Sequence, residues 1–135
     1  FMIYTTYFAK LRNLPSNIIP ISICAKAPSW YTGLQYKKLA PKYNFFTEWK
    51  KTHDNNYYIE HFNSEVLSCL LPHQVLNDLY DMLPQNVKDN TTSMLHLHNN
   101  FHIALVCYEK PSDFCHRHLV AKWFCENGIQ CTEFI

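Results

Sequence analysis

Hydrophobic and polar positions along this chain of 135 residues follow two periods, one typical of strands and one typical of helices. Residues 2–9 (MIYTTYFA) and 17–25 (NIIPISICA) are rich in β-branched and aromatic side chains, and both predict strands. Pro20 donates no backbone hydrogen bond, so it predicts an edge position or a bulge in the second strand. Residues 101–109 (FHIALVCYE) hold a continuous apolar run, which predicts a strand buried on both faces of a parallel sheet.

Helical spacing of apolar side chains recurs in the middle of the chain. The helices that it predicts span residues 41–53, 55–70 and 71–83. Pro72 suits the first turn of the third helix, because a backbone N–H there has no partner within the helix. The polar stretch 84–100 predicts a short helix over Met94–His98.

The last part of the chain predicts a helix between two strands. Ser112 or Asp113 provides the N-cap for a helix over residues 114–127, which follows strand 101–109. Gly128 closes that helix as the residue after its C-cap. With a last strand over residues 129–134, this segment predicts one βαβ unit.

These elements predict an α/β fold: a single compact three-layer domain over residues 1–135, Rossmann-like, with a mainly parallel sheet. In such folds, ligands bind outside the carboxyl ends of the strands. We therefore expect ligand contacts from residues that follow strands and from the aromatic, basic loop 26–41. These residues are Tyr7, Lys26, Trp30, Tyr31, Lys37, Lys38, Cys107, Tyr108 and Arg117.

Two of the loop aromatics have alternative interpretations. Trp30 and Tyr31 lie beside lysines in a proline-bounded loop, where they could stack on a base or a sugar. The alternative is that the loop is anchored by its own aromatic side chains. The sequence favours neither.

Composition and charge exclude several classes of function. Two glycines cannot provide a glycine-rich phosphate loop, and a formal net charge of +1 argues against a nucleic-acid partner. No apolar stretch approaches the length of a membrane span, so no membrane partner is expected. The chain has six cysteines and shows no signal peptide, which predicts a cytoplasmic protein with mostly free thiols.

Several segments together resemble a known family. "PISI" followed by "AKAPSW", then "LAP", then "VCYEKPSDFCHRHLVAKWF", is similar to the domain of unknown function 488, a family of bacterial and phage proteins. The segment "CYEK…CHRH" is the most specific of these marks, and the resemblance covers nearly the whole chain. It implies a compact single α/β domain and no particular activity.

The segment CYEKPSDFCHRHL, residues 107–119, carries the densest chemistry of the chain. Arg117 follows the predicted N-terminus of a helix, where unpaired backbone N–H groups favour an anion. Its planar guanidinium could hold a phosphate or carboxylate with two hydrogen bonds. The alternative is an ion pair within the protein, with Asp113 or with Glu109.

A metal site is a second interpretation of the same segment. Cys107, Cys115 and His118 could bind zinc, since Cys115 and His118 share one face of the helix and His116 points elsewhere. The spacing matches no standard structural zinc pattern. Any cofactor therefore stays unknown at this point.

Catalysis is a third interpretation. A thiol at a helix N-terminus beside His and Arg should have a lowered pKa, which makes Cys115 a candidate nucleophile. His116 or His118 could serve as its base, and Glu109 could orient that base. Glu109 or His116 could also act alone as an acid–base group. Otherwise Cys115 is a packed residue at the helix start.

The sequence thus favours the binding or processing of a phosphate-bearing, nucleotide-like small molecule at the carboxyl edge of the sheet. The alternative is a non-enzymatic protein–protein interaction module, in which the high aromatic content serves a homodimer or a host factor. Arg117 should matter most in the first case, and exposed Tyr and Trp side chains in the second.

Overall fold

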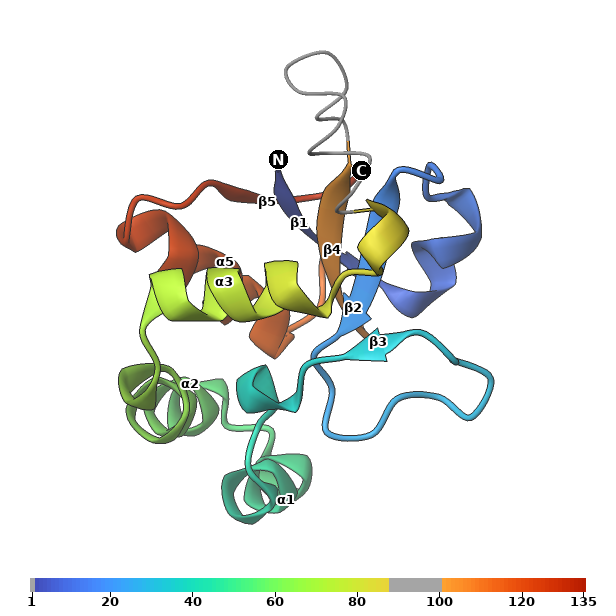
Figure 1. Cartoon of the computed structure of the whole chain (residues 1–135). Helices are drawn as coiled ribbons and strands as arrows, with labels where there is room; N and C mark the ends of the chain where they lie inside the picture. Colours follow the sequence, from blue (N-terminus) through green and yellow to red (C-terminus); the bar gives the residue numbers. More distant parts are fainter. Residues whose placement is uncertain (1, 88–100) are drawn as a thin grey trace.

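One parallel sheet of five strands organises the protein, and four of the strands coincide with those that the sequence predicts (Figure 1). The structure is a computed structural model that describes residues 2–87 and 101–135. The strands are β1 (Ile3–Tyr7), β2 (Ile18–Ser22), β3 (Leu34–Gln35), β4 (His102–Cys107) and β5 (Cys131–Glu133). The two-residue strand β3 lies in segment 26–41, which the sequence analysis interprets as a loop.

The strand order is β3-β2-β4-β1-β5, and each adjacent pair is parallel. The predicted α/β fold with a parallel sheet is therefore confirmed. The predicted βαβ unit forms from β4, the helix after it and β5, with β1 lying between the two strands. The order interchanges β1 and β4 relative to the arrangement 3-2-1-4-5 of dinucleotide-binding folds. The Rossmann-like part of the prediction is not confirmed.

Pro20 shows how a proline is accommodated inside this sheet. Strand β2 lies between β3 and β4, so it is not an edge strand by order. However, β3 pairs only with Ile21 and Ser22, and Pro20 pairs only with Ala104 of β4. The missing N–H of Pro20 therefore removes no ladder bond to β3, which agrees with the local edge position that proline requires.

Four longer helices form where the sequence predicts them, with shorter bounds. They are α1 (Tyr43–Thr52), α2 (Asn55–Glu65), α3 (Pro72–Met82) and α5 (His116–Glu126). The 3₁₀-helix η3 (Leu67–Cys69) replaces the predicted end of α2. Helix α5 begins two residues later than predicted, and Cys115 replaces Ser112 or Asp113 as its N-cap.

The short helix predicted over Met94–His98 lies outside the described residues. None of the helices in residues 2–87 and 101–135 has the length and apolarity needed to cross a membrane.

The main core lies on one face of the sheet. Alternate residues of β4, Ile103 and Leu105, point into it and are fully buried. Each of the four helices adds buried side chains to the same cluster, among them Phe45, Phe62 and Phe124. Burial of apolar surface in this cluster is the main source of stability of the fold.

The opposite face has a thinner cover. The 3₁₀-helix η1 (Phe8–Asn13) directly follows β1, so the strand predicted to reach residue 9 ends at Tyr7. Phe8, Cys24 and Val106 form a second cluster there, with Tyr31 packed against it. Figure 1 shows η1 on the side of the sheet opposite α3 and α5. The third layer thus consists of a 3₁₀-helix and a loop.

Candidate functional site

The carboxyl ends of β1, β2, β4 and β5 meet at one edge of the sheet, because all strands run in the same direction. The segments that leave this edge contact each other directly. The hydroxyl of Tyr108, just after β4, donates a hydrogen bond to the carbonyl oxygen of Lys26, in the loop after β2, at 2.8 Å. The structure thus brings together strand ends that lie 82 residues apart in the sequence.

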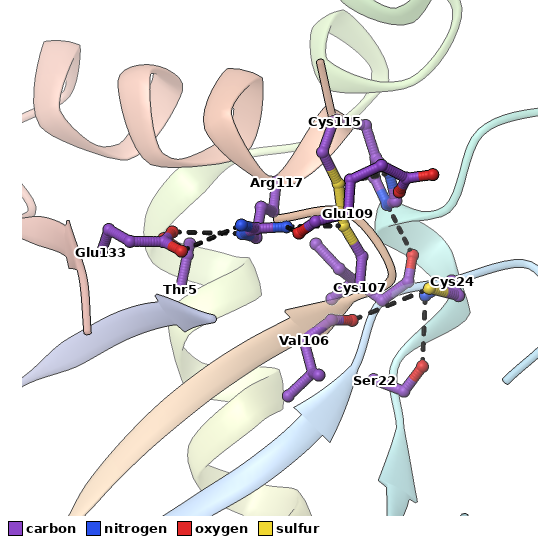
Figure 2. The surroundings of a disulfide bond; sticks show 11 residues. Thr5, Ser22, Cys24, Val106, Cys107, Glu109, Cys115, Arg117 and Glu133 are labelled. Carbon is purple, nitrogen blue, oxygen red and sulfur yellow. Dashed lines mark hydrogen bonds and ion pairs between the residues drawn. A yellow bond between two sulfur atoms is a disulfide. The ribbon is translucent and has the colours of Figure 1, made fainter. Parts of the chain in front are cut away.

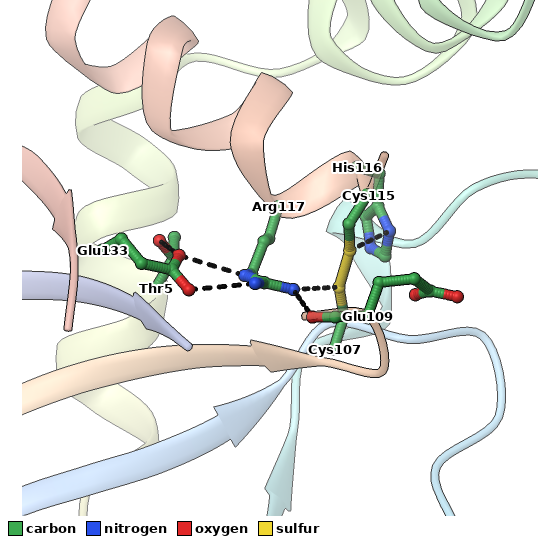
Figure 3. A network of polar contacts seen from close by, with 7 residues as sticks. All are labelled: Thr5, Cys107, Glu109, Cys115, His116, Arg117 and Glu133. Atoms are coloured by element: carbon green, nitrogen blue, oxygen red, sulfur yellow. Dashed lines mark hydrogen bonds and ion pairs between the residues drawn. A yellow bond between two sulfur atoms is a disulfide. The ribbon is translucent and has the colours of Figure 1, made fainter. Parts of the chain in front are cut away.

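Arg117 is the largest fully buried side chain among the described residues, and it lies at this edge. Its Nε and Nη2 atoms donate to the two carboxylate oxygens of Glu133 at 3.1 and 2.9 Å. Its Nη1 atom donates to the carbonyl oxygen of Glu109 at 2.6 Å and to Sγ of Cys107 at 3.4 Å (Figure 3). The guanidinium therefore joins β5, the end of β4 and the turn before α5.

This arrangement differs from both interpretations of Arg117 in the sequence analysis. The partner is the Glu133 carboxylate at the end of β5, and neither the Asp113 nor the Glu109 carboxylate. The planar fork expected to bind an anion is already occupied by that carboxylate. Tyr7, an expected ligand contact, packs against the guanidinium with its ring centre 5.8 Å from Cζ of Arg117. In this structure, Arg117 acts as a positioning residue.

Two cysteines of the segment are covalently joined. Cys107 ends β4 and Cys115 precedes α5, and a disulfide links them across the intervening turn (Figure 2). Both residues are buried, whereas the other four cysteines are free. The sequence analysis predicts mostly free thiols and does not predict this pair. As part of a disulfide, Cys115 has no thiolate with which to act as a nucleophile.

His116 lies beside this disulfide and is also buried. Its Nε2 atom is 2.8 Å from the carbonyl oxygen of Ile23, and its Nδ1 atom is 4.0 Å from Sγ of Cys115. Because a carbonyl oxygen only accepts hydrogen bonds, Nε2 carries the proton and Nδ1 keeps a free lone pair. Burial lowers the pKa of His116 to about 4, so the ring is neutral at physiological pH.

The ligand atoms of Cys107, Cys115 and His116 all lie within 4.8 Å of one another. The sequence predicts His118 as the third ligand of such a site and predicts that His116 points away from it. The structure corrects this assignment. His118 follows two residues later on α5, and its Nε2 atom is buried without a hydrogen-bond partner. Cys115 is the N-cap of α5 and has an extended backbone, with φ of −156° and ψ of 142°, so helical spacing does not relate it to His118.

A cavity of about 150 Å³ opens at this edge, next to the disulfide. Its lining is mostly apolar and contains five of the residues that the sequence analysis proposes for the site. The lining residues are Cys24, Ala25, Lys26, Pro41, Phe46, Cys107, Tyr108, Glu109 and His116. Lys26 and Glu109 are the two residues of this lining that carry charge, since His116 is neutral.

A comparison with known families identifies the family of the chain. A family model described as the active DUF488-N3 subclade matches residues 10–128, a range that contains the disulfide, His116 and Arg117. The chain belongs to the DUF488 family. No curated protein and no solved structure matches it. The function of this DUF488 protein must therefore be inferred from its own residues.

The loop aromatics of the DUF488 protein have different roles. Tyr31 is an anchor: its hydroxyl donates to the carbonyl oxygen of Leu34 at 2.7 Å, and its ring packs against Phe8. Burial raises the pKa of Tyr31 to about 12. Trp30 is 60% exposed and contacts the Phe8 ring edge-on. Tyr31 thus holds the loop in place, whereas most of the Trp30 side chain is exposed to solvent.

The three lysines predicted to contact a ligand lie at two different places. Lys26 lines the cavity. Lys37 and Lys38 lie in the 3₁₀-helix η2 (Lys37–Leu39) and line a separate groove. The Nζ atom of Lys38 is 3.8 Å from the carboxylate of Asp78. Pro41 lines both the cavity and that groove, so the two sites adjoin.

Phe46 lines the cavity and Glu133 supports the site through Arg117, and neither is among the predicted contacts. Burial raises the pKa of Cys24 to about 12, so its side chain remains a thiol at neutral pH and acts as part of the apolar wall. Glu133 ends a strand at the same edge, so the rule that selects strand ends could have identified it. Phe46 comes from α1, and no local signal connects that helix to the cavity.

Proposed function

We propose that this DUF488 protein binds and processes a phosphate-bearing, nucleotide-like small molecule in the cavity at the carboxyl edge of the sheet. The observation that carries the proposal is the cavity itself, an apolar pocket whose charged groups are one cation, Lys26, and one carboxylate, Glu109. Small-molecule sites are usually apolar concavities with a few polar groups that fix orientation. Their usual place in α/β proteins is this edge.

The size of the cavity limits what enters it. A cavity of about 150 Å³ accommodates a single small ring, and is too small for a whole nucleotide. We infer that a ring of the ligand lies between Phe46 and the Cys107 end of β4. The phosphate then stays at the mouth, where exposed Lys26 supplies the opposite charge. Trp30 provides a further exposed aromatic surface at the same edge.

Glu109 is the acid–base group in this proposal. It lines the cavity and is partly exposed, so its carboxylate can reach a bound ligand. Its backbone carbonyl oxygen accepts a hydrogen bond from the buried Arg117, which holds the residue in place. His116 lies in the same lining, with its Nδ1 atom directed at Sγ of Cys115. A positioned acid–base group contributes about 100-fold or more to a rate.

Binding is tested first by thermal shift, followed by calorimetric titration, with nucleotides, sugar phosphates and inorganic phosphate. A ligand at 100 times its Kd stabilises a protein by about 2.7 kcal/mol. We expect Lys26→Ala to weaken binding of the best ligand at least about 10-fold. Lys51→Ala removes an exposed lysine at the end of α1 and serves as the matched control. A panel without stabilisation, or equal effects of the two variants, would contradict the proposal.

Catalysis is tested with the ligand found in this way. Glu109→Gln keeps the size of the side chain and removes its basicity. We expect it to retain binding and to lower turnover at least about 100-fold. Unchanged turnover would exclude Glu109 as the acid–base group.

An interaction module is the second candidate, favoured by one observation. Trp30 and Tyr108 are 60% and 49% exposed, and both rings pack edge-on against Phe8. Exposed aromatic groups of this kind often dominate protein interfaces. If this surface pairs two copies of the chain, the protein should dimerise in sedimentation experiments, and Trp30→Ala should abolish the dimer. A monomer at all concentrations would remove the homodimer.

A further inference from the structure

Two cysteine sulfur atoms and one imidazole nitrogen converge beside the cavity. They are Sγ of Cys107, Sγ of Cys115 and Nδ1 of His116, all within 4.8 Å of one another. The three residues are 1%, 5% and 7% exposed, so they are shielded from bulk solvent. Two thiolates and one imidazole form a donor set that zinc and related divalent ions prefer.

His116 is arranged as a metal ligand requires. The carbonyl oxygen of Ile23 accepts a hydrogen bond from Nε2, which fixes the proton on that nitrogen. The lone pair on Nδ1 is then directed towards the sulfur atoms, with Sγ of Cys115 4.0 Å away. Metal-binding histidines in proteins commonly donate their other ring N–H to such an acceptor.

The separation of the two cysteines leaves room for an ion. Their Cα atoms are 7.5 Å apart, whereas about 4.4–6.8 Å is usual for a disulfide. Zinc–sulfur bonds of about 2.3 Å in tetrahedral geometry separate two sulfur atoms by about 3.8 Å. Rotation of the Cys107 and Cys115 side chains after reduction can provide that separation.

The charges around the group also balance. Arg117 and Glu133 form an ion pair and neutralise each other. Two thiolates and one divalent ion add no net charge to this buried region, which keeps the cost of desolvation low. The Nη1 atom of Arg117 lies 3.4 Å from Sγ of Cys107 and donates to it, an interaction that a thiolate strengthens.

We infer that the reduced protein binds one zinc-class divalent ion through Cys107, Cys115 and Nδ1 of His116, and that the disulfide is the metal-free, oxidised state of the same site. A dithiol reductant connects the two states. Its sulfur atoms close into a disulfide, while two electrons and two protons pass to Cys107 and Cys115. Both thiol protons are released when the ion binds. Since Cys107 and His116 also line the cavity, the ion would face the ligand site.

The test is a metal titration of the whole chain, without any organic ligand, so that its failure leaves the proposed function untouched. The protein is reduced with a dithiol, freed of reductant without oxygen, and titrated with Co²⁺ and then Zn²⁺. We expect one ion per chain, thiolate-to-cobalt charge-transfer absorption and the release of two protons. Cys107→Ser, Cys115→Ser and His116→Gln should each weaken binding at least about 100-fold, more than the loss of a supporting residue does.

Two controls separate a missing ligand from a missing fold. Cys125→Ser removes an exposed free thiol, and His118→Gln removes the neighbouring histidine; both should bind the ion as the wild type does. The oxidised wild type keeps every residue, yet it should not bind the ion until the dithiol is added. The inference is overturned if the reduced wild type binds no ion, if the oxidised form binds it equally, or if His116→Gln behaves like His118→Gln.

Discussion

At the residue scale, the candidate site depends on one buried ion pair. Arg117 is fully buried and Glu133 is mostly buried, and two parallel hydrogen bonds join them. Thr5 adds a third contact, because its hydroxyl donates to Glu133 at 2.6 Å. This pair connects β5 to the segment that carries Cys107 and Glu109. Glu133 therefore has a structural role that the residues next to it in the sequence do not indicate.

Removing one partner of this ion pair should lower the free energy of unfolding strongly. Glu133→Gln leaves the Arg117 charge buried without its counter-charge, for which a loss of about 3–5 kcal/mol in the free energy of unfolding is expected. Adding Arg117→Met to that variant removes the unpaired charge and should restore much of the stability. Urea denaturation of both single variants and the double variant measures the coupling. Glu60→Gln, on the exposed side of α2, is the control and should change stability by less than about 0.5 kcal/mol. Equal effects of Glu133→Gln and Glu60→Gln would contradict a buried pair.

A second residue-scale prediction concerns Asp78 on α3. The hydroxyl of Tyr36 donates to its carboxylate at 2.6 Å, and this hydrogen bond is the main reason why the pKa of Asp78 lies below its ordinary value of 3.8. Because the folded pKa is lowered, Asp78 contributes stability above pH 3.8, and this contribution is lost as the pH falls through the folded pKa. Tyr36→Phe should move the pKa of Asp78 back towards 3.8 in an NMR titration. Tyr43→Phe, at an exposed position, should leave it unchanged; a pKa that is equally low in both variants would exclude the hydrogen bond as the cause.

At the element scale, α5 ends as the sequence predicts. Gly128 follows the helix with φ of +80°, and its N–H donates to the carbonyl oxygen of Cys125. A Cβ atom added there would meet no atom within 4 Å, so any cost of substitution comes from the backbone conformation. We expect Gly128→Ala to lower the free energy of unfolding by about 1 kcal/mol. Gly128→Asn should cost less, since asparagine adopts this conformation more readily. If alanine is tolerated as well as asparagine in urea denaturation, the left-handed turn does not limit stability.

The elements show which part of the fold is predictable from sequence. Strands β1, β2 and β4 are predictable because each is a local run of β-branched or aromatic residues, and α3 is predictable because one face is apolar. Strand β3 is not predictable, since two residues are too few to show the alternation of apolar and polar side chains that marks a strand. The strand-end rule can place Glu133 at this edge, but it does not identify it as the partner of Arg117, which lies 16 residues away in the sequence. Local patterns thus predict the elements, whereas the contacts of the site arise from their packing.

At the scale of the whole molecule, the site rests on the most buried part of the sheet. Ile103, Ala104, Leu105 and Val106 of β4 have no exposed surface, and β4 has a strand on either side. Cys107 is the last residue of this strand, and Glu109 lies two residues beyond it. The edge strand β5 has a neighbour on one side only, and it holds three residues. The centre of the sheet should therefore be more stable than the edge.

Hydrogen exchange can measure this difference. Opening of β4 requires separation from both β1 and β2 and exposure of the main core, so its amides should exchange only through global unfolding. Their exchange free energies should then equal the free energy of unfolding from urea denaturation. The amides of β5 should exchange through local opening, with clearly lower protection. The Glu133→Gln variant should lower protection in β5 further, because the ion pair with Arg117 holds that strand to the edge of the sheet. If the amides of β4 and β5 exchange at the same rate in the wild type, the sheet opens as one unit. The carboxyl end of β4, which positions Cys107 and Glu109, is then no more stable than the edge of the sheet.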